Sequence, residues 1–584
     1  MQKGAMFILE NIDPDKIFTP EDFSDEHKMI AATVADFVEN EIIPNVEELD
    51  HQKEGLMRSI LEKAGELGLL SADIPEEYDG GEMGKIAAAI ITENVSTGGS
   101  FAVSHGAHTG IGSLPIVLFG NEEQKKKYLP GLATGELVAA YALTEPMAGS
   151  DALGAKTKAV LTEDGKYYLL NGEKIFITNA GFADVYVTYA KIDGDKFTAF
   201  IIDKGTPGFS VGAEEKKLGI KGSSTCSLIF EDAQVPVENV LGEIGKGHVI
   251  AFNILNIGRY KLGAGGVGSS KKALEVAAKY ALERQQFGLP IAKFGMIKNK
   301  LAQMAAKTYA SESLVYRLVG EIEEVLEDKS DGKEIGAAIE DYAIECSIAK
   351  VHASETLDYV CDECVQIHGG YGYTQEFPAE RFYRDSRINR IFEGTNEVNR
   401  LIIPATLLRR GMKGQLPLLQ AAQALAGEVM SLRAKTPTGD EAPFEIEMDM
   451  IDRAKKLCLM VGGTAAQKYM QKIVKEQEII EIMANMAIEI YAMESAVLRA
   501  QKALQNDPEN AETKVELALA YVYDAFPKLD AWGKQALAYM FDGGDMLRTN
   551  LSIVKRLAKY TPINLIAIRQ KVAAKVLEAG KYVV

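Results

Sequence analysis

The segment YYLLNGEKIFIT, residues 167–178, decides the fold. It is rich in aromatic and β-branched side chains, which favour extended strands. Asn171 and Gly172 lie between two such runs, and this pair is typical of a two-residue hairpin turn. We therefore predict strands at 167–170 and 174–178 joined by a turn. Residues near 200 and 228 have the same strand-favouring composition, so we predict a compact β region.

Helical patterns flank this β region on both sides. Ser24 precedes Asp25 and Glu26, an order typical of a capped helix start, and apolar residues then follow at helical spacing. Near the other end, a polar loop at 434–443 with two prolines interrupts the helical pattern. We predict a mainly α protein with a central β domain, divided into an N-terminal α-helical domain at 1–137, a middle β domain at 138–246, a helical-bundle domain at 247–410 and an additional α-helical extension at 411–584.

The bulk composition excludes several classes of protein. The chain has 584 residues, more than one hydrophobic core accommodates, and its formal net charge is −19. A field of this sign repels nucleic acid, and an anionic ligand needs a local cradle of basic groups or amides. Five cysteines are too few for a disulfide scaffold. We read no signal peptide and no transmembrane run, and expect a cytoplasmic protein if the source is bacterial.

Two glycine-containing motifs could bind a ligand. In LTEPMAGSD, residues 143–151, Gly149 and Ser150 offer amides and a hydroxyl to a flat polar ligand. In isolation this motif also fits a tight surface turn. In QIHGGYGY, residues 366–373, the glycines permit close approach of a ligand or a second chain, or mark the end of a helix.

A third motif, RIFEGTNE at residues 390–397, contains the candidate catalytic group. The carboxylate of Glu393, between Phe392 and Gly394, could lie in an apolar pocket that raises its pKa and suits it to act as a base. The ordinary alternative is an exposed glutamate at a helix start.

These three motifs, in this order and with Arg384-Asp385 between the last two, resemble the acyl-CoA dehydrogenase family over about residues 25–410. The most similar branch is the very-long-chain one, which also carries a C-terminal helical extension and a segment like LNIGR at 255–259. The resemblance implies an α-helical N-terminal domain, a β-barrel-like middle domain and a four-helix-bundle C-terminal domain, followed by the extra helical region.

The resemblance also implies a reaction. An FAD-dependent enzyme of this family converts a fatty acyl-CoA, here expected to be of long chain, to trans-2-enoyl-CoA in fatty acid β-oxidation and passes electrons to electron transfer flavoprotein. Glu393 matches the base that takes the α-proton, while the flavin takes the β-hydride. Arg259 matches an arginine close to this base. Two roles are equally open for it: to orient the carboxylate or lower its pKa, or to form a buried ion pair inside the bundle.

Other site residues follow from matching family positions. The positions that contact FAD are Tyr141, Leu143, Thr144, Gly149, Ser150, Phe176, Thr178, Arg284, Phe287, Gln366, Gly369, Gly370, Thr395 and Glu397. The positions that face the substrate are Ser100, Ser104, Ser150, Arg259, Phe392 and Gly394. Small side chains at Ser100 and Ser104 would leave a deep acyl cavity.

The same match implies a homo-oligomer. In the family, the positions of Arg284, Phe287, Gln366, Gly369 and Gly370 contact the FAD of a neighbouring subunit. The extension covers the face that relatives use to form tetramers, which favours a dimer. Peripheral membrane association is also implied by the branch, although the acidic loop after Arg433, with Asp440, Glu441, Glu445 and Glu447, argues against binding to anionic lipid.

Alternative readings remain at this point. An acyl-CoA oxidase would hand its electrons to oxygen, and some relatives are non-enzymatic assembly or DNA-binding proteins. The G-x-G-x-x-G pattern at 263–268 follows no strand, so we predict close helix packing rather than a dinucleotide site. The C-x-x-C pattern at 361–364 has no second cysteine pair, and we predict no metal site.

Overall fold

The computed structural model describes residues 3–429 and 431–584. The N-terminal region is helical, and its first long helix begins at Ser24, whose hydroxyl accepts a hydrogen bond from the N–H of His27. The predicted helix start is therefore confirmed. The helices of this region are α1 (Asp25–Phe37), α2 (Val46–Asp50), α3 (Leu56–Glu66), α4 (Gly84–Val95), α5 (Ser100–Gly106), α6 (Leu114–Phe119) and α7 (Glu122–Thr134).

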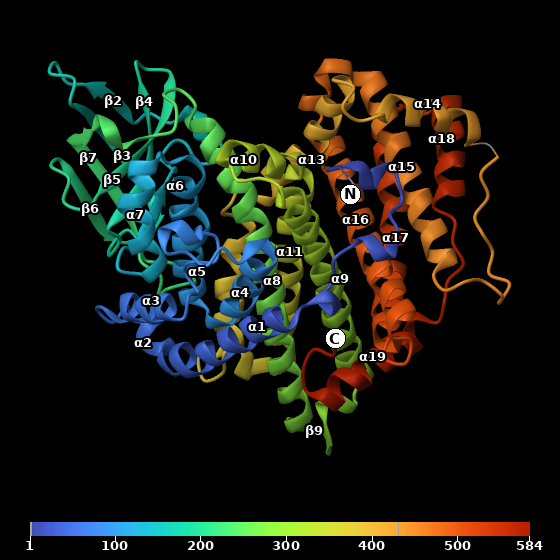
Figure 1. Cartoon of the computed structure of the whole chain (residues 1–584). Coiled ribbons are helices and arrows are strands. Elements are labelled where there is room, and N and C mark those ends of the chain that lie inside the picture. Colours follow the sequence, from blue (N-terminus) through green and yellow to red (C-terminus); the bar gives the residue numbers. More distant parts are fainter. Residues whose placement is uncertain (1–2, 430) are drawn as a thin grey trace.

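An eight-stranded sheet follows, at the upper left of Figure 1. The hydrogen-bonded order is β6-β7-β3-β2-β4-β5-β8, and β1 pairs in parallel with β4. The strands are β1 (Ala139–Ala142), β2 (Lys158–Leu161), β3 (Tyr167–Thr178), β4 (Val185–Ile192), β5 (Lys196–Asp203), β6 (Phe209–Glu214), β7 (Thr225–Pro236) and β8 (Val240–Leu241). The predicted mainly α fold with a central β region is confirmed.

The predicted hairpin at Asn171-Gly172 is wrong, because β3 runs through both residues as one strand antiparallel to β7. The register shifts between Leu170 and Gly172, so the pair forms a β-bulge instead of a turn. The Asn171 side chain accepts a hydrogen bond from the Asp232 N–H and donates one to its carboxylate. A Cβ atom at Gly172 would lie 2.4 Å from the Thr157 hydroxyl oxygen, so glycine serves close strand packing here.

A bundle of long helices forms the centre of the molecule. It contains α8 (Gly247–Glu283), α9 (Gly295–Leu326), α10 (Gly332–Asp341), α11 (Ala343–His368), α12 (Ala379–Ser386) and α13 (Asn396–Met412), with the short strands β9 (Gln285–Gln286) and β10 (Leu289–Pro290) after α8. The G-x-G-x-x-G pattern lies inside α8. A Cβ atom at Gly268 would clash with the carbonyl of Glu93 on α4, so the prediction of close helix packing is confirmed.

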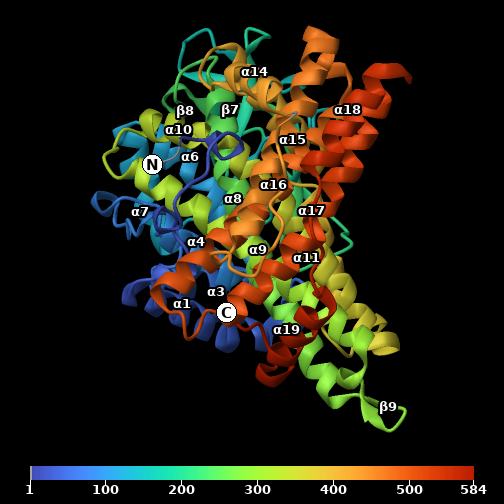
Figure 2. The same ribbon diagram turned by 90° about the vertical axis from the view of Figure 1, so that its right-hand side faces the viewer.

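The C-terminal extension packs along one side of this bundle, as Figure 2 shows. Its helices are α14 (Leu418–Glu428), α15 (Glu445–Tyr469), α16 (Gln477–Asn506), α17 (Glu512–Met540), α18 (Gly544–Leu557) and α19 (Leu565–Ala579). Buried ion pairs join the two parts: Arg317 of α9 binds Glu494 of α16 at 2.9 Å, and Arg499 of α16 binds Glu312 of α9 at 2.6 Å. The extension therefore shares its core with the bundle.

The segment before α1 also contacts the extension. Glu21 binds Arg499 at 2.8 Å, and the ring of Phe7 packs edge-on against Tyr491. Within residues 3–429 and 431–584, no helix combines the length and apolar character needed to cross a membrane.

Candidate functional site

Glu393 lies in a left-handed turn between α12 and α13. Its φ is 56° and that of Gly394 is 79°, and the first value is uncommon for a residue with a side chain. Thr395 caps α13 by accepting a hydrogen bond from the Val398 N–H at 3.2 Å. The side-chain amide of Asn399 donates to the carbonyl of Gly394 at 2.8 Å. These contacts hold the turn in a conformation that the backbone alone disfavours.

The carboxylate of Glu393 is shielded from solvent and incompletely paired. Its Oε2 atom finds no hydrogen-bond partner among the residues that the structure describes. Burial raises the pKa of Glu393 to about 7, although the positive charges of Arg259 and Lys350 act in the opposite direction. A Cβ atom at Gly258 of α8 would lie 2.7 Å from this oxygen, so glycine makes the space that the carboxylate occupies. Glu393 is therefore poised to take a proton near neutral pH.

Arg259 approaches the main chain of the turn. Its Nε atom donates to the carbonyl of Glu393 at 3.4 Å, and one terminal nitrogen donates to the Asn256 side chain at 2.8 Å. No ion pair within 4.0 Å between Arg259 and a carboxylate is present in the described part of the chain. Of the two roles left open by the sequence, proximity to Glu393 with an effect on its pKa is the one that these contacts favour.

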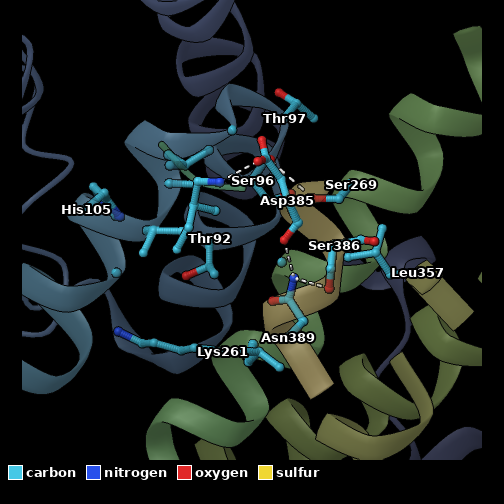
Figure 3. Close-up of a pocket in the computed structure, with 18 of the residues that line it drawn as sticks. Thr92, Ser96, Thr97, His105, Lys261, Ser269, Leu357, Asp385, Ser386 and Asn389 are labelled. Carbon is cyan, nitrogen blue, oxygen red and sulfur yellow. Dashed lines mark hydrogen bonds between the residues drawn. The ribbon is translucent and has the colours of Figure 1, made fainter. Parts of the chain in front are cut away.

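An apolar cavity of about 210 Å³ opens beside Glu393. Its walls come from α4, from α5 and the following π-helical turn (Ala107–Gly112), from α8, and from the segment between α12 and Glu393. Figure 3 shows Thr92 of α4, Ser96 just after that helix and, from the end of α12 onward, Asp385, Ser386 and Asn389 around this space. Phe392 and Thr178 also line it.

Ser100 and Ser104 do not line this cavity, and their contact with the substrate stays a prediction. Ser100 donates to the Asp50 carboxylate at 3.0 Å and accepts the Gly222 N–H, while the Ser104 side chain is fully buried. Neither residue lines the cavity; its α5 wall is formed by neighbours such as Ala102 and Val103. The face that α5 turns toward the cavity depends on how the helix is rotated, which a sequence match does not determine.

The LTEPMAGSD segment is fixed against β3. Lys174 and Glu145 form a buried ion pair at 2.7 Å, and the Ile175 N–H donates to the carbonyl of Thr144 at 2.9 Å. Leu143 joins this anchor, because its carbonyl accepts a hydrogen bond from Lys174. Gly149 and Ser150 are exposed at the end of the same loop.

Next to this loop, β3 presents an aromatic face. Its register shifts between Lys174 and Ile177, and Phe176 has a φ of 60° and a side chain that is 61% exposed. The buried hydroxyl of Tyr141 has no hydrogen-bond partner among the described residues. Burial raises its pKa well above the usual value, with smaller contributions from Tyr189 and from Glu393, so Tyr141 lies near the base. The exposed ring of Phe176, the exposed Gly149 and Ser150, and the buried hydroxyl of Tyr141 fit a flat, polar and partly apolar group such as a flavin.

The residues predicted to contact the FAD of a neighbouring subunit lie elsewhere, whereas Thr395 and Glu397 lie at the start of α13 beside Glu393. A surface depression brings together Arg284, Gly369 and Gly370. Phe287 lies in the nearby β9–β10 turn and is 92% exposed, and Gln366 is exposed on the last turn of α11. None of these residues lines the cavity at Glu393. Figure 1 shows β9 projecting from the end of the bundle that points away from the sheet.

The sequence did not point to three residues that lie close to Glu393: Gly258, Lys350 and Asn399. Lys350 offers a signal in retrospect, because it interrupts the apolar run Ile348-Ala349-Lys350-Val351 in a helix. Gly258 and Asn399 act through packing and backbone contacts, which leave no such mark. In residues 3–429 and 431–584, no group of three or more His, Cys, Asp and Glu side chains could hold a metal ion.

Comparison with known proteins identifies the family. Models of the acyl-CoA dehydrogenase N-terminal, middle and C-terminal domains match residues 24–136, 140–233 and 245–408, and a further acyl-CoA dehydrogenase C-terminal domain model matches residues 453–556. The last match lies within the extension.

Relatives match over the whole chain. A probable acyl-CoA dehydrogenase of Bacillus subtilis is 55% identical over 100% of this chain and 99% of its own. The human very long-chain specific acyl-CoA dehydrogenase is 35% identical over 80% of this chain and 73% of its own. The crystal structure of an acyl-CoA dehydrogenase complexed with FAD from Bacillus anthracis is 56% identical, with a TM-score of 0.97 and full coverage of both chains. We conclude that the chain belongs to the acyl-CoA dehydrogenase family and is an FAD-dependent oxidoreductase.

Proposed function

We propose that the protein converts long-chain fatty acyl-CoA thioesters to trans-2-enoyl-CoA in fatty acid β-oxidation, with Glu393 as the base. The observation that carries the proposal is the carboxylate of Glu393, which lies at the wall of an apolar cavity, lacks a partner at Oε2 and has a pKa of about 7. A base of this pKa is both available and strong enough at neutral pH.

Each part of the chain has a distinct task in this proposal. The apolar cavity holds the acyl chain and excludes water from the reacting carbons. Glu393 takes the α-proton at its carboxylate, and the backbone N–H of Glu393 donates to the thioester oxygen as negative charge develops there. Phe176, Thr178 and the loop at 141–150 bind FAD, and Gly394 and Phe392 shape the space next to the substrate. Bound FAD supplies the acceptor for the β-hydride.

The preference for a long chain rests on the cavity walls and on the relatives. Small residues line the cavity on several elements, including Gly99, Ala102, Gly106 and Gly265. Positions without a side chain leave room for additional methylene groups. The human relative named above carries very long-chain specificity in its name.

We further propose that the active protein is a homodimer that passes electrons to electron transfer flavoprotein. Arg284, Gly369 and Gly370 lie together in a surface depression apart from the Glu393 cavity, and Phe287 is exposed nearby. If they contact FAD, that FAD belongs to a second subunit. Thr395 and Glu397, at the start of α13, would reach the cofactor from the same chain as the base.

One assay separates the parts of this proposal. Purified protein is supplied with butyryl-, octanoyl- and palmitoyl-CoA, with electron transfer flavoprotein or with air as the acceptor. We expect the highest kcat/KM for palmitoyl-CoA with the flavoprotein, and little hydrogen peroxide in air. A preference for butyryl-CoA would overturn the long-chain assignment, and stoichiometric peroxide would identify an oxidase.

A complementation test addresses the dimer. Glu393→Gln and Arg284→Met would each impair every site when expressed alone. Co-expressed, they form mixed dimers in which one of the two sites carries neither change, so activity above that of either variant is expected. If mixing restores no activity, the two residues act in the same subunit's site.

A further inference from the structure

Lys350 of α11 lies directly beneath the turn that carries Glu393. The side chain is fully buried. Its ammonium group donates to the carbonyl of Gly394 at 2.8 Å and to the Asn396 side-chain oxygen at 2.7 Å. One acceptor belongs to Gly394, a left-handed residue of the turn, and the other to Asn396 just after it, so the cation binds the C-terminal side of the strained turn.

The surroundings of this lysine differ from those of two buried lysines elsewhere in the chain, Lys455 of α15 and Lys174 of β3. Lys455 binds the carboxylate of Glu494 at 2.5 Å, and Lys174 binds that of Glu145. Lys350 instead has two neutral oxygens as its partners among the described residues. A buried cation without a bonded carboxylate is costly, and such a group is rarely retained for stability alone.

The charged groups around Lys350 come from four elements. Burial lowers its pKa to about 7, the charge of Glu393 opposes this most strongly, and Arg259 of α8 adds to it. Glu355 of α11 and Glu397 of α13 act in the same direction as Glu393. Glu355 is itself bound to Arg400 at 2.7 Å. Lys350 and Glu393 therefore titrate in one pH range and behave as a coupled pair.

We propose that Lys350 is a positioning residue for the base: its ammonium group holds the Glu393-Gly394 turn in place, and its positive charge sets the pH at which the carboxylate becomes free to accept a proton. This inference rests on the proposed role of Glu393. It assigns to Lys350 no contact with substrate or cofactor.

Three substitutions separate the hydrogen bonds from the charge. Lys350→Gln keeps a donor and removes the charge, Lys350→Met removes both, and Lys350→Arg keeps the charge. Lys307→Met is the matched control, because Lys307 is a largely buried lysine of α9 that packs over the ring of Tyr359 at 5.1 Å. All proteins are used as FAD-loaded holoenzymes, and kcat and kcat/KM for palmitoyl-CoA are followed from pH 5.5 to 9.5.

Removing the charge of Lys350 should have a pH-dependent effect on kcat/KM. Loss of a positive neighbour disfavours the carboxylate form, so the acid limb of kcat/KM moves upward by about one pH unit in Lys350→Gln and Lys350→Met. The corresponding loss is about tenfold at pH 6, and in Lys350→Gln it disappears by pH 9. Lys350→Met also loses kcat at every pH because the turn is released. Lys350→Arg and Lys307→Met keep the wild-type limb.

Failure of the inference about Lys350 can be told apart from failure of the proposed function. Wild type must reduce its flavin with palmitoyl-CoA and Glu393→Gln must not; otherwise the base assignment itself falls. If that condition holds and both Lys350→Gln and Lys350→Met retain the wild-type acid limb and kcat, Lys350 has no part in positioning the base. If Lys350→Met fails to fold, the limbs of Lys350→Gln and Lys350→Arg alone decide the question.

Discussion

Two buried glutamates of the bundle, Glu312 and Glu393, differ in the number of donors that reach them. Glu312 on α9 binds Lys271, Arg499 and the hydroxyl of Tyr582. Burial raises its pKa, but the cations Arg499 and Lys271 outweigh burial and leave the value lowered. Glu393 has cations nearby but no partner at Oε2, and its pKa rises to about 7. Both carboxyl groups are buried, so the difference lies in their hydrogen-bond donors. With its donors, Glu312 joins helices; without a partner at Oε2, Glu393 can accept a proton.

The largest expected effect is the loss of activity in Glu393→Gln. The amide keeps the shape of the side chain but cannot take a proton, and kcat should fall by at least about 100-fold. FAD content, followed by visible absorbance, should equal that of wild type. A variant with a full complement of FAD and near-normal kcat would show that Glu393 is not the base.

For Glu312→Gln we expect a loss of stability and not a loss of kcat. Removing the charge of Glu312 leaves Arg499 and Lys271 less well paired in the core, which should lower the free energy of unfolding by about 3 kcal/mol. The measurement is the midpoint of thermal unfolding, with kcat per folded molecule as the control. Unchanged stability would mean that the ion network does not hold the extension to the bundle.

The pH dependence of kcat/KM tests the raised pKa of Glu393. Because only the carboxylate form of Glu393 accepts a proton, kcat/KM should fall about tenfold per unit as pH drops below about 7. A rate profile that is flat from pH 5.5 to 8 would rule out a base with this pKa.

Glu393 and Glu312 should contribute to the stability of the protein with opposite dependence on pH. The pKa of Glu393 is raised from 4.5, so its contribution to stability is present below about pH 4.5 and is lost as pH rises through about 7. The pKa of Glu312 is lowered, so its contribution is present at neutral pH and is lost as pH falls through that lowered value. At pH 8, Glu393→Gln should therefore be at least as stable as wild type, and a clear loss of stability there would contradict the raised pKa.

The smallest expected effect is at Tyr582. Tyr582→Phe removes one neutral donor from Glu312 and leaves both cations in place. We expect stability to fall by about 1 kcal/mol without a change in kcat. A loss as large as that of Glu312→Gln would show that the C-terminal contact, and not the ion pairs, dominates this site.

The sequence predicted what depends on residue type and spacing. Ser24 marked a helix start, and the glutamate of the FEGTN segment marked the candidate base. Features that depend on rotation or register were not predictable. Asn171-Gly172 is a turn signal that β7 converts into a bulge, and the cavity face of α5 excludes Ser100 because the hydroxyl binds Asp50. Lys350 was missed because its partners are backbone and amide oxygens distant in sequence.

The most direct test of the central claim is an anaerobic titration of the FAD-loaded protein with palmitoyl-CoA, followed through the visible absorbance of the flavin. Octanoyl-CoA and isovaleryl-CoA serve as comparison substrates, and Glu393→Gln with FAD bound serves as the matched variant. We predict that palmitoyl-CoA bleaches the wild-type flavin and leaves that of Glu393→Gln oxidised. Bleaching in both proteins, or in neither, would contradict the assignment of Glu393 as the base that oxidation of a long-chain acyl-CoA requires.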